Sequence, residues 1–549
     1  MAARTAPGLV KGAELLALAL QGQGVKWIGT LCGHGLDEVY AACHRAGIRL
    51  IDVRNEQSAG YMAECWGRLS GQVGVCAVSS GVAHANAMTG VINAHFDGAP
   101  MLLLTGAGAR RTAGMGHFQD LDQVALAAPV CKYARVLDVP ERIPVQVHEA
   151  FAAALSGRPG PVHLTFPMDV QEAQVERATL PPPAQRPGPM YPAPHQLEQA
   201  ADLLAKARRP LLVAGSGVYY ARGEEALAQF AAACAIPVVV PIWDRGTVPV
   251  GMPEYLGVIG AASGGPPLLE EADLVILLGA AADYRMGFLQ TPPLAAEARL
   301  LRIDADAARL SQGRPADLSI QADPGATLAQ LLKGCAKGQI GDFAPWLQTA
   351  RQGRDKFRQQ VVGGVRRGEG LHALDLIEAL RGVLTPETVL IVDGGSIGQW
   401  FHQTLGREGY PGHWLTCGVS GVVGYGIAGA MAARAGFADR PVILLSGDGS
   451  ATFTLAELEC AARQHLPFAM IVADDQSWGI TATGHRRRYG ETLSSTLGPV
   501  DFAAAAQAFG ALGTQVSTIA ELTGALRQAL RESLPTLIHA PIAGGMPGE

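Results

Sequence analysis

The stretch from Val442 to Gly479, VILLSGDGSATFTLAELECAARQHLPFAMIVADDQSWG, decides how the chain is interpreted. An apolar strand at 442–446 runs into Gly447-Asp448-Gly449-Ser450, a helical stretch follows at 454–464, and a second apolar strand at 468–473 ends on Asp474-Asp475. Parallel strands joined by a helix end at the same edge of a sheet, where open α/β sheets bind their ligands. We therefore expect these carboxylates to meet at one sheet edge.

The residue types at this edge suit a phosphorylated ligand and a metal ion. Glycines on both sides of Asp448 let a phosphate approach the backbone, and the helix that follows offers its N-terminal amides. Carboxylates are ligands for a hard divalent cation. A diphosphate bridged by magnesium fits all three features, although an isolated Gly-Asp-Gly is also common in turns.

Strands and helices alternate along the whole chain, which predicts an α/β fold of three doubly wound parallel-sheet domains. A similar proline spacing around 161–167 and 535–541 indicates that the first and third domains share one topology, unless these prolines only flank edge strands. The expected parts are an N-terminal domain at 1–178, a proline-rich linker at 179–195, a central domain at 196–340, a linking helix at 341–372 and a C-terminal domain at 373–549.

Composition narrows the classes of partner. The 549 residues carry a net charge of −6 without a basic stripe, so we expect small-molecule partners and no nucleic acid. We expect no membrane span, and the apolar run Leu15–Leu20 is too short for a secretion signal. Nine cysteines without Cys-x-x-Cys spacing predict reduced thiols and a cytoplasmic location. Hydrophobic residues make up 48% of the chain, which favours self-association.

Gly447-Asp448-Gly449, followed after 25 residues by Asp475, resembles the signature of thiamine-diphosphate enzymes, in which Gly-Asp-Gly precedes Asn-Asn at the end of the next strand. The resemblance implies thiamine diphosphate and Mg²⁺ as cofactors, with Asp448, Asp475 and the carbonyl of Ser477 as metal ligands. Here Asp474-Asp475 replaces Asn-Asn. The additional negative charge beside a diphosphate bears on ion choice and cofactor affinity.

The same resemblance implies a set of cofactor-binding residues. Asp393-Gly394-Gly395-Ser396 is expected on the diphosphate side, and Val422 either bends the cofactor or packs in the core. The full set is Glu56, Ser79, Asn86, Asp393, Gly394, Gly395, Ser396, Val422, Gly447, Asp448, Gly449, Ser450, Asp475, Ser477, Trp478 and Gly479.

Glu56, in the first domain, matches the activating glutamate of the family. A carboxyl group bonded to the aminopyrimidine ring favours the imino tautomer, which removes the thiazolium C2 proton. Taken alone, Glu56 is better interpreted as a first-turn acid that complements a helix dipole, and the joint match with the third domain reverses this preference. In this family the first and third domains meet across a subunit interface, so the resemblance implies a homodimer at minimum and favours a homotetramer.

Three further residues are catalytic or substrate-side candidates. Gln119, in the loop 116–122, matches a family glutamine that orients the substrate carbonyl or hydroxyl. His34 lies where related lyases place a proton-shuttling histidine, and His117 is a weaker candidate. Solvated loop side chains are the alternative interpretation. The expected substrate pocket comprises His34, His117, Gln119, Ile397 and Ile480.

The subfamily motifs point in different directions. Residues 215–223 and 55–61 look like 2-hydroxyacyl-CoA lyase and oxalyl-CoA decarboxylase, whereas 475–479 looks like benzaldehyde lyase. In the segment 278–284 this chain has alanine where the two coenzyme A enzymes carry an arginine after Gly-Ala. A phosphate-binding charge for coenzyme A is therefore missing at that position. The expected activity is a carbon–carbon lyase or carboligase that acts on 2-hydroxy ketones or acyl compounds through an enamine-carbanion intermediate.

Three alternatives remain open, and each implies different partners. They are an acetolactate-synthase-like decarboxylase and ligase of 2-oxo acids, an FAD-bearing enzyme similar to pyruvate oxidase, and a non-catalytic scaffold. FAD is possible but is not an expected cofactor. The candidate substrates are 2-oxo acids, 2-hydroxy ketones, aldehydes and acyl compounds.

Overall fold

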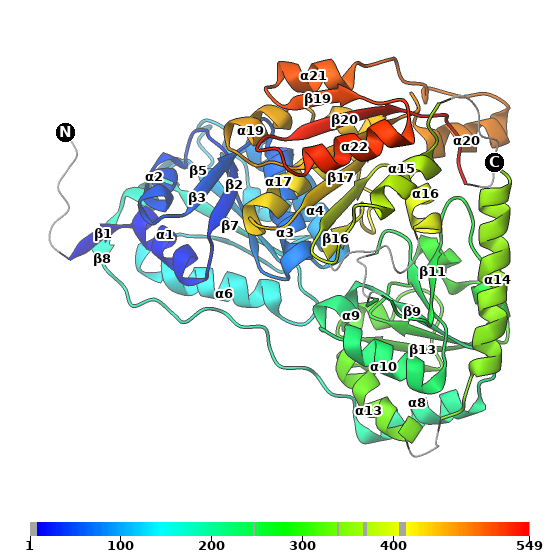
Figure 1. Ribbon diagram of the computed structural model, residues 1–549. Helices are drawn as coiled ribbons and strands as arrows, with labels where there is room; N and C mark the ends of the chain where they lie inside the picture. The colour runs from blue at the N-terminus through cyan, green and yellow to red at the C-terminus, as the bar shows by residue number, and fades with distance from the viewer. Residues whose placement is uncertain are drawn as a thin grey trace.

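The computed structural model describes residues 8–244, 248–249, 251–336, 340–365, 370–405 and 413–547. They form three α/β domains, which Figure 1 shows as three lobes, the first from blue to cyan, the central one in green and the third from yellow to red. Each domain holds a parallel sheet of six strands. The expected fold class is confirmed.

The first and third sheets have the same topology. The first sheet has the order β3-β2-β4-β5-β7-β6 and the third has the order β16-β15-β17-β18-β20-β19. The first sheet comprises β2 (Trp27–Leu31), β3 (Arg49–Asp52), β4 (Gly74–Val78), β5 (Met101–Ala107), β6 (Tyr133–Val136) and β7 (Pro161–Pro167). The third comprises β15 (Val389–Asp393), β16 (His413–Leu415), β17 (Val442–Gly447), β18 (Ala469–Asp474), β19 (Leu512–Gln515) and β20 (Thr536–Pro541). The proline-flanked strands β7 and β20 occupy equivalent interior positions, so they are not edge strands.

Helices cover both faces of these two sheets. In the first domain, α1 (Gly12–Gly22), α2 (Asp37–Arg45) and α6 (Ile143–Leu155) share one core, while α3 (Glu56–Ser70), α4 (Val82–Asp97) and α5 (Gln123–Ala127) lie against the other face. In the third, α15 (Ala373–Arg381), α16 (Ser396–Thr404) and α22 (Ile519–Ala529) cover one face, and α17 (Gly426–Gly436), α19 (Glu457–Arg463) and α21 (Phe502–Ala508) cover the other.

The central domain has a different topology and its own core. Its strand order is β11-β10-β9-β12-β13-β14, the order typical of dinucleotide-binding folds. The strands are β9 (Pro210–Ala214), β10 (Val238–Pro241), β11 (Tyr255–Ile259), β12 (Leu274–Leu278), β13 (Arg299–Asp304) and β14 (Leu318–Gln321), and the principal helices are α8 (Pro194–Lys206), α10 (Glu224–Cys234) and α13 (Pro324–Ala336).

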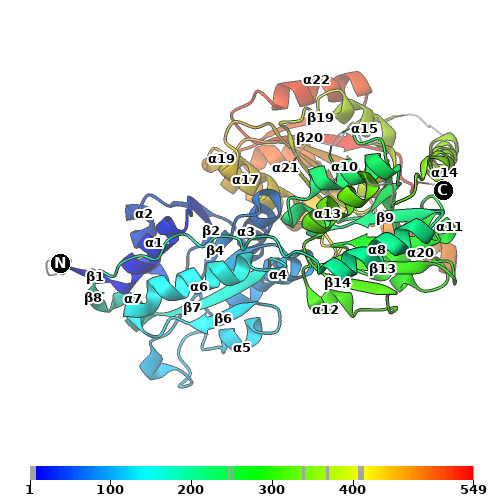
Figure 2. The ribbon, with the colours of Figure 1, turned by 90° about the horizontal axis from the view of Figure 1, so that it is seen from below.

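Two connections join the domains. A segment without helix or strand, 177–193, leads from the short strand β8 (Gln174–Glu176), which pairs with β1 (Leu9–Lys11), past the first domain to α8 (Figures 1 and 2). The expected linking helix at 341–372 contains α14 (Ala344–Gly363), and its first half packs into the central core through Trp346. Residues 366–369 of that stretch lie outside the described residues.

The first and third domains share one continuous hydrophobic core. Helix α3 packs against both α4 and α17, and buried residues of all three helices belong to the same cluster. Glycines allow the close approach, since a Cβ atom on Gly429 would lie 3.2 Å from the Sγ of Cys65. The two domains therefore behave as one packing unit, to which the central domain is attached.

A buried ionic cluster lies at this junction. The Arg68 guanidinium, fully buried, lies 3.4 Å from Glu64 and 3.7 Å from Asp97, and it donates a hydrogen bond to the carbonyl of Thr416 in the third domain. Burial raises the pKa of Glu64 to about 7, and the positive charge of Arg68 opposes that rise. Arg68 is thus the cation that lies beside both carboxylates.

Other features agree with the composition. Six of the eight described cysteines are buried, Cys32 is exposed, and Cys131 is partly buried. In the described part of the chain, every helix is too short or too polar to cross a membrane. The run Leu15–Leu20 lies in α1, mostly inside the core of the first domain.

Replacing Arg68 by alanine would leave two buried carboxylates without their cation. We expect R68A to lower the free energy of unfolding by about 3–5 kcal/mol, the usual result of removing one partner of a buried pair. Urea unfolding followed by tryptophan fluorescence measures this change. The control is R45A, which removes an exposed ion pair to Glu14 and should cost about 1 kcal/mol or less. Equal effects of R68A and R45A on the free energy of unfolding would contradict the role of Arg68 in the buried cluster.

Candidate active site

A cavity of about 220 Å³ opens at the carboxyl ends of β15, β17 and β18. Eleven of the sixteen expected cofactor-binding residues line it: Gly394, Gly395, Ser396, Gly447, Asp448, Gly449, Ser450, Asp475, Ser477, Trp478 and Gly479. Ile397 and Ile480, expected in the substrate pocket, line it as well. The sheet therefore brings the two motifs of the third domain together.

Glycines shape the floor of this cavity. Gly394 has φ +133°, and a Cβ atom there would lie 2.8 Å from the backbone nitrogen of Gly447. A Cβ atom on Gly449 would lie 2.8 Å from the indole ring of Trp478. Larger residues at these positions would fill the space between the loops, so the glycines keep the backbone open to a phosphate group.

The carboxylates of the site differ in what they contact. Asp475 lines the cavity and accepts a hydrogen bond of 3.1 Å from the Ser477 hydroxyl. Asp474 is buried and lies 2.9 Å from the Nε2 atom of His539 on β20. The pKa of Asp448 is raised to about 7, chiefly by burial and also by the negative charges of Asp475 and Asp474. Of the two residues that replace Asn-Asn, Asp475 is the one available to a ligand.

A divalent cation would relieve the repulsion between Asp448 and Asp475. Among the described residues there is no group of three or more His, Cys, Asp or Glu side chains that could hold a metal ion. Two carboxylates and a backbone carbonyl leave several positions of a magnesium ion for phosphate oxygens and water. The donor set thus fits an ion that bridges the protein and a diphosphate.

Two expected residues contact protein groups rather than the cavity. Asp393 is buried and accepts hydrogen bonds from the N–H groups of Gly424 and Gly426. Burial raises its pKa to about 7, and those donors oppose the rise. Val422 packs against the shared core, whereas Gly421 and Val423 line the cavity. Asp393 therefore holds the loop that carries Gly421 and Val423.

The cavity also contains residues that sequence reasoning missed. Trp243 comes from the loop after β10 of the central domain, has φ +66°, and lies over Gly421. The other lining residues without an earlier assignment are Trp400, Cys417, Ala473, Thr481, Ile542 and Gly545. Tryptophan rarely adopts the left-handed backbone region, so the sequence does not indicate that Trp243 has this conformation.

The candidates of the first domain gather at the carboxyl ends of its own strands. Glu56 begins α3, after the N-cap residue Asn55, and accepts a hydrogen bond of 3.0 Å from the Asn86 side-chain amide. The Ser79 hydroxyl donates to the carbonyl of His34 at 2.6 Å. Glu56 is half-buried and Asn86 is exposed, so the pair is open to a ligand or to another chain.

The substrate-side candidates form a second group on the same domain. The rings of His34 and His117 stack with centroids 5.7 Å apart, and Phe118 contacts His34 edge-on. Gln119 has φ +54° and accepts a hydrogen bond from Ser80. None of these first-domain candidates lines the cavity of the third domain in the same chain.

Three regions of the chain match the domains of one protein family. Residues 10–126 match the N-terminal TPP binding domain of thiamine pyrophosphate enzymes, 197–331 match the central domain, and 393–540 match the C-terminal TPP binding domain. The chain belongs to the thiamine pyrophosphate enzyme family. Most residues that line the cavity lie within the C-terminal binding domain of this family, and Glu56 lies within the N-terminal one.

Several relatives of the chain share the name acetolactate synthase. The chain is 30% identical to the acetolactate synthase large subunit of Parasynechococcus marenigrum, over 98% of this chain and 89% of that protein. It is 30% identical to the acetolactate synthase isozyme 2 large subunit of Escherichia coli, over 97% and 96% of the two chains. A probable acetolactate synthase large subunit of Methanocaldococcus jannaschii is 28% identical, over 97% and 92%. This thiamine pyrophosphate enzyme is thus similar to these proteins along its whole length.

A second cavity bears on the possibility of FAD. It measures about 120 Å³ at the carboxyl ends of β9 and β13, between Gly217, Asp304 and Arg158. Doubly wound sheets bind nucleotides at this position, but pockets for small molecules usually measure about 300–1,000 Å³. The linker residues 186–190 line this cavity as well.

Asn in place of Asp475 would remove one negative charge from the metal-diphosphate position. We expect D475N to bind thiamine diphosphate about tenfold more tightly at fixed Mg²⁺, the equivalent of one pKa unit of charge interaction. Calorimetric titration measures the affinity. The matched variant D474N breaks the buried contact with His539 and should instead lower the free energy of unfolding by about 1.5–3 kcal/mol. Unchanged binding by D475N would contradict the placement of Asp475 at the metal-diphosphate position.

Proposed function

We propose that the chain is a thiamine diphosphate- and magnesium-dependent carboligase that decarboxylates one 2-oxo acid and joins its acyl unit to a second. The observation that carries the proposal is the full-length similarity to acetolactate synthase large subunits. The likeness to benzaldehyde lyase rests on the five residues 475–479 alone, so the alternative expected from the sequence is favoured over the first interpretation.

The third domain supplies the cofactor-binding part of the proposal. Asp448, Asp475 and the Ser477 carbonyl would ligate Mg²⁺, and the glycine loops at 394–395 and 447–449 would approach the diphosphate. Thiamine diphosphate, when bound, supplies the carbon nucleophile for the reaction. Trp243, Val423 and Ile480 would exclude water above it.

The first domain would act on the cofactor of a second copy of the chain. Glu56, held by Asn86, does not line the cavity of its own chain, so a homodimer would bring the two together. Next to Asn86, helix α4 exposes Val82, Ile92 and Phe96, apolar side chains that a partner would cover. The homodimer, and a homotetramer built from two dimers, are part of the proposal.

In such a dimer Glu56 would exchange a proton with the aminopyrimidine ring. His34, His117 and Gln119 would face the substrate from the same domain, and two neighbouring imidazoles provide N–H donors for the carboxylate of a 2-oxo acid. The clustered carboxylates and the open cavity favour this reading over a non-catalytic scaffold. The buried thiols support a cytoplasmic location.

Pyruvate as the only substrate tests the proposed reaction. Two pyruvate molecules and one proton should yield one acetolactate and one carbon dioxide, in the presence of thiamine diphosphate and Mg²⁺. Product formation is measured by chromatography and carbon dioxide release. Cleavage of a 2-hydroxy ketone such as benzoin, without any ligation of pyruvate, would instead favour the lyase interpretation.

Replacing Glu56 by glutamine tests the role of that residue. We expect E56Q to keep most of its affinity for thiamine diphosphate and to lose exchange of the cofactor C2 proton by about 100-fold or more, since general acid–base catalysis contributes about 10²–10⁴-fold. Calorimetry measures the affinity, and deuterium incorporation measures the exchange. Unchanged C2 proton exchange in E56Q would refute the role of Glu56. If the unaltered protein showed no magnesium-dependent binding of thiamine diphosphate, the proposal that it is an enzyme of this kind would be refuted.

The matched partner for this variant is D448A, which removes a proposed metal ligand. If sites form between two chains, a mixture of E56Q and D448A chains contains dimers with one intact site, and exchange reappears. If both residues act within one chain, the mixture stays inactive.

A further inference from the structure

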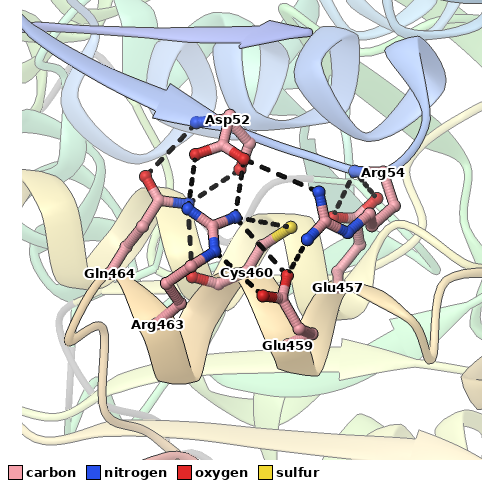
Figure 3. A network of polar contacts seen from close by, with 7 residues as sticks. All are labelled: Asp52, Arg54, Glu457, Glu459, Cys460, Arg463 and Gln464. Carbon is pink, nitrogen blue, oxygen red and sulfur yellow. Dashed lines mark hydrogen bonds and ion pairs between the residues drawn. The ribbon is translucent and has the colours of Figure 1, made fainter.

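The N-terminus of α3, which carries Glu56, is held by the third domain of the same chain. Figure 3 shows Asp52 and Arg54, at the end of β3, facing helix α19 with its residues Glu457, Glu459, Arg463 and Gln464. These contacts join segments that are about 400 residues apart in the sequence. They form two layers with different exposure.

The inner layer is the buried carboxylate of Glu457. The backbone N–H of Arg54 donates to both of its oxygens, at 3.1 and 3.0 Å, two residues before Glu56. Only 1% of Glu457 is exposed. Burial raises the pKa of this carboxyl, and the N–H group of Arg54 opposes that rise. A carboxylate at the N-terminal end of a helix also complements the helix dipole.

The outer layer consists of exposed ion pairs. Arg463 makes a two-pronged pair with Asp52, at 3.1 and 2.6 Å, and Glu459 pairs with both Arg463 and Arg54. The side chains are 31–46% exposed, and pairs of this kind contribute little. Two side chains of the α19 segment bond to the backbone before Glu56: Gln464 bonds to Asp52, and Glu457 bonds to Arg54. Glu457 is the nearer of the two to Glu56, and it is the buried one.

Glu457 belongs to the segment that forms the metal-diphosphate site. Helix α18 (Asp448–Phe453) carries Asp448, and α19 begins with Glu457 after a single turn. The N–H of Glu457 donates to the carbonyl of Thr454 at 2.9 Å, and the Thr454 hydroxyl donates to the carbonyl of Gly424 at 3.0 Å. The turn between Asp448 and Glu457 is thus held on both sides.

We propose that Glu457 is a positioning residue for Glu56, which it orients by fixing the backbone at the start of α3. The inference rests on the proposed function, in which Glu56 activates a cofactor. Adhesion between the domains has a separate source, the apolar core between α3 and α17. In the proposed dimer, the diphosphate segment of each chain supports the glutamate that serves the other site.

The variant E457Q tests this inference, because it keeps the size of the side chain but turns one acceptor oxygen into a donor. In the protein without cofactor, we expect faster amide hydrogen exchange at residues 54–58. With thiamine diphosphate and Mg²⁺, we expect C2 proton exchange to slow by about 10- to 100-fold, the effect of displacing a reacting group by about 1 Å. The calorimetric affinity for the cofactor should stay unchanged.

The matched control is E459Q, which alters the exposed layer of the same network and should leave both exchange rates unchanged. E457D keeps both acceptor oxygens on a shorter side chain and should give intermediate values, which also covers a failure of E457Q to fold. Equal effects of E457Q and E459Q would overturn the inference, as would a loss of cofactor affinity parallel to the loss of exchange. Faster amide exchange with unchanged C2 exchange would overturn it while leaving the proposed function intact.

Discussion

The packing of α3 against α17 is the constraint on which the rest of the structure depends. It merges the first and third domains into one core and fixes both sides of the site. On one side, Arg68, Asp97 and Asn93 hold the loop 416–420, which leads directly to Gly421 and Val423 in the cavity wall. On the other side, α3 begins at Glu56, next to α19. A helix that serves two domains in this way cannot shift for one without disturbing the other.

The sequence predicted the interior of the sheets better than their edges. In the three six-stranded sheets, the sequence did not predict four of the described strands, β6, β11, β16 and β19, and each lies at the edge of its sheet. Edge strands have a neighbour on one side only, so they need no continuous apolar run, as the sequence LGTQ of β19 illustrates. The interior strand β17, in contrast, is almost fully buried, and its sequence VILLSG is apolar nearly throughout.

The candidate site divides along similar lines. Gly394, Asp448 and Asp475 were predictable because each directly follows a recognisable strand, and parallel strands deliver their ends to one place. Trp243 was not, since it arrives from another domain through a backbone conformation that no local pattern encodes. Val422 was expected to face the cofactor, but Val423 lines the cavity and Val422 packs against the core. A loop motif therefore identifies the segment but not which of its side chains points inward. Short motifs also suggested a benzaldehyde-lyase-like activity, whereas the whole chain resembles acetolactate synthases.

The shared core has a consequence for how the chain is made. Cys65 of α3 and Gly429 of α17 touch in the folded protein, yet about 360 residues separate them in the sequence. At a synthesis rate of about 5–20 residues per second, the first domain leaves the ribosome on the order of tens of seconds before its partner exists. During that interval the face of α3 that later meets α17 stays exposed, while its other contacts, with α4 and the first sheet, can already form. The length of the central domain therefore sets how long this apolar surface stays uncovered in the nascent chain.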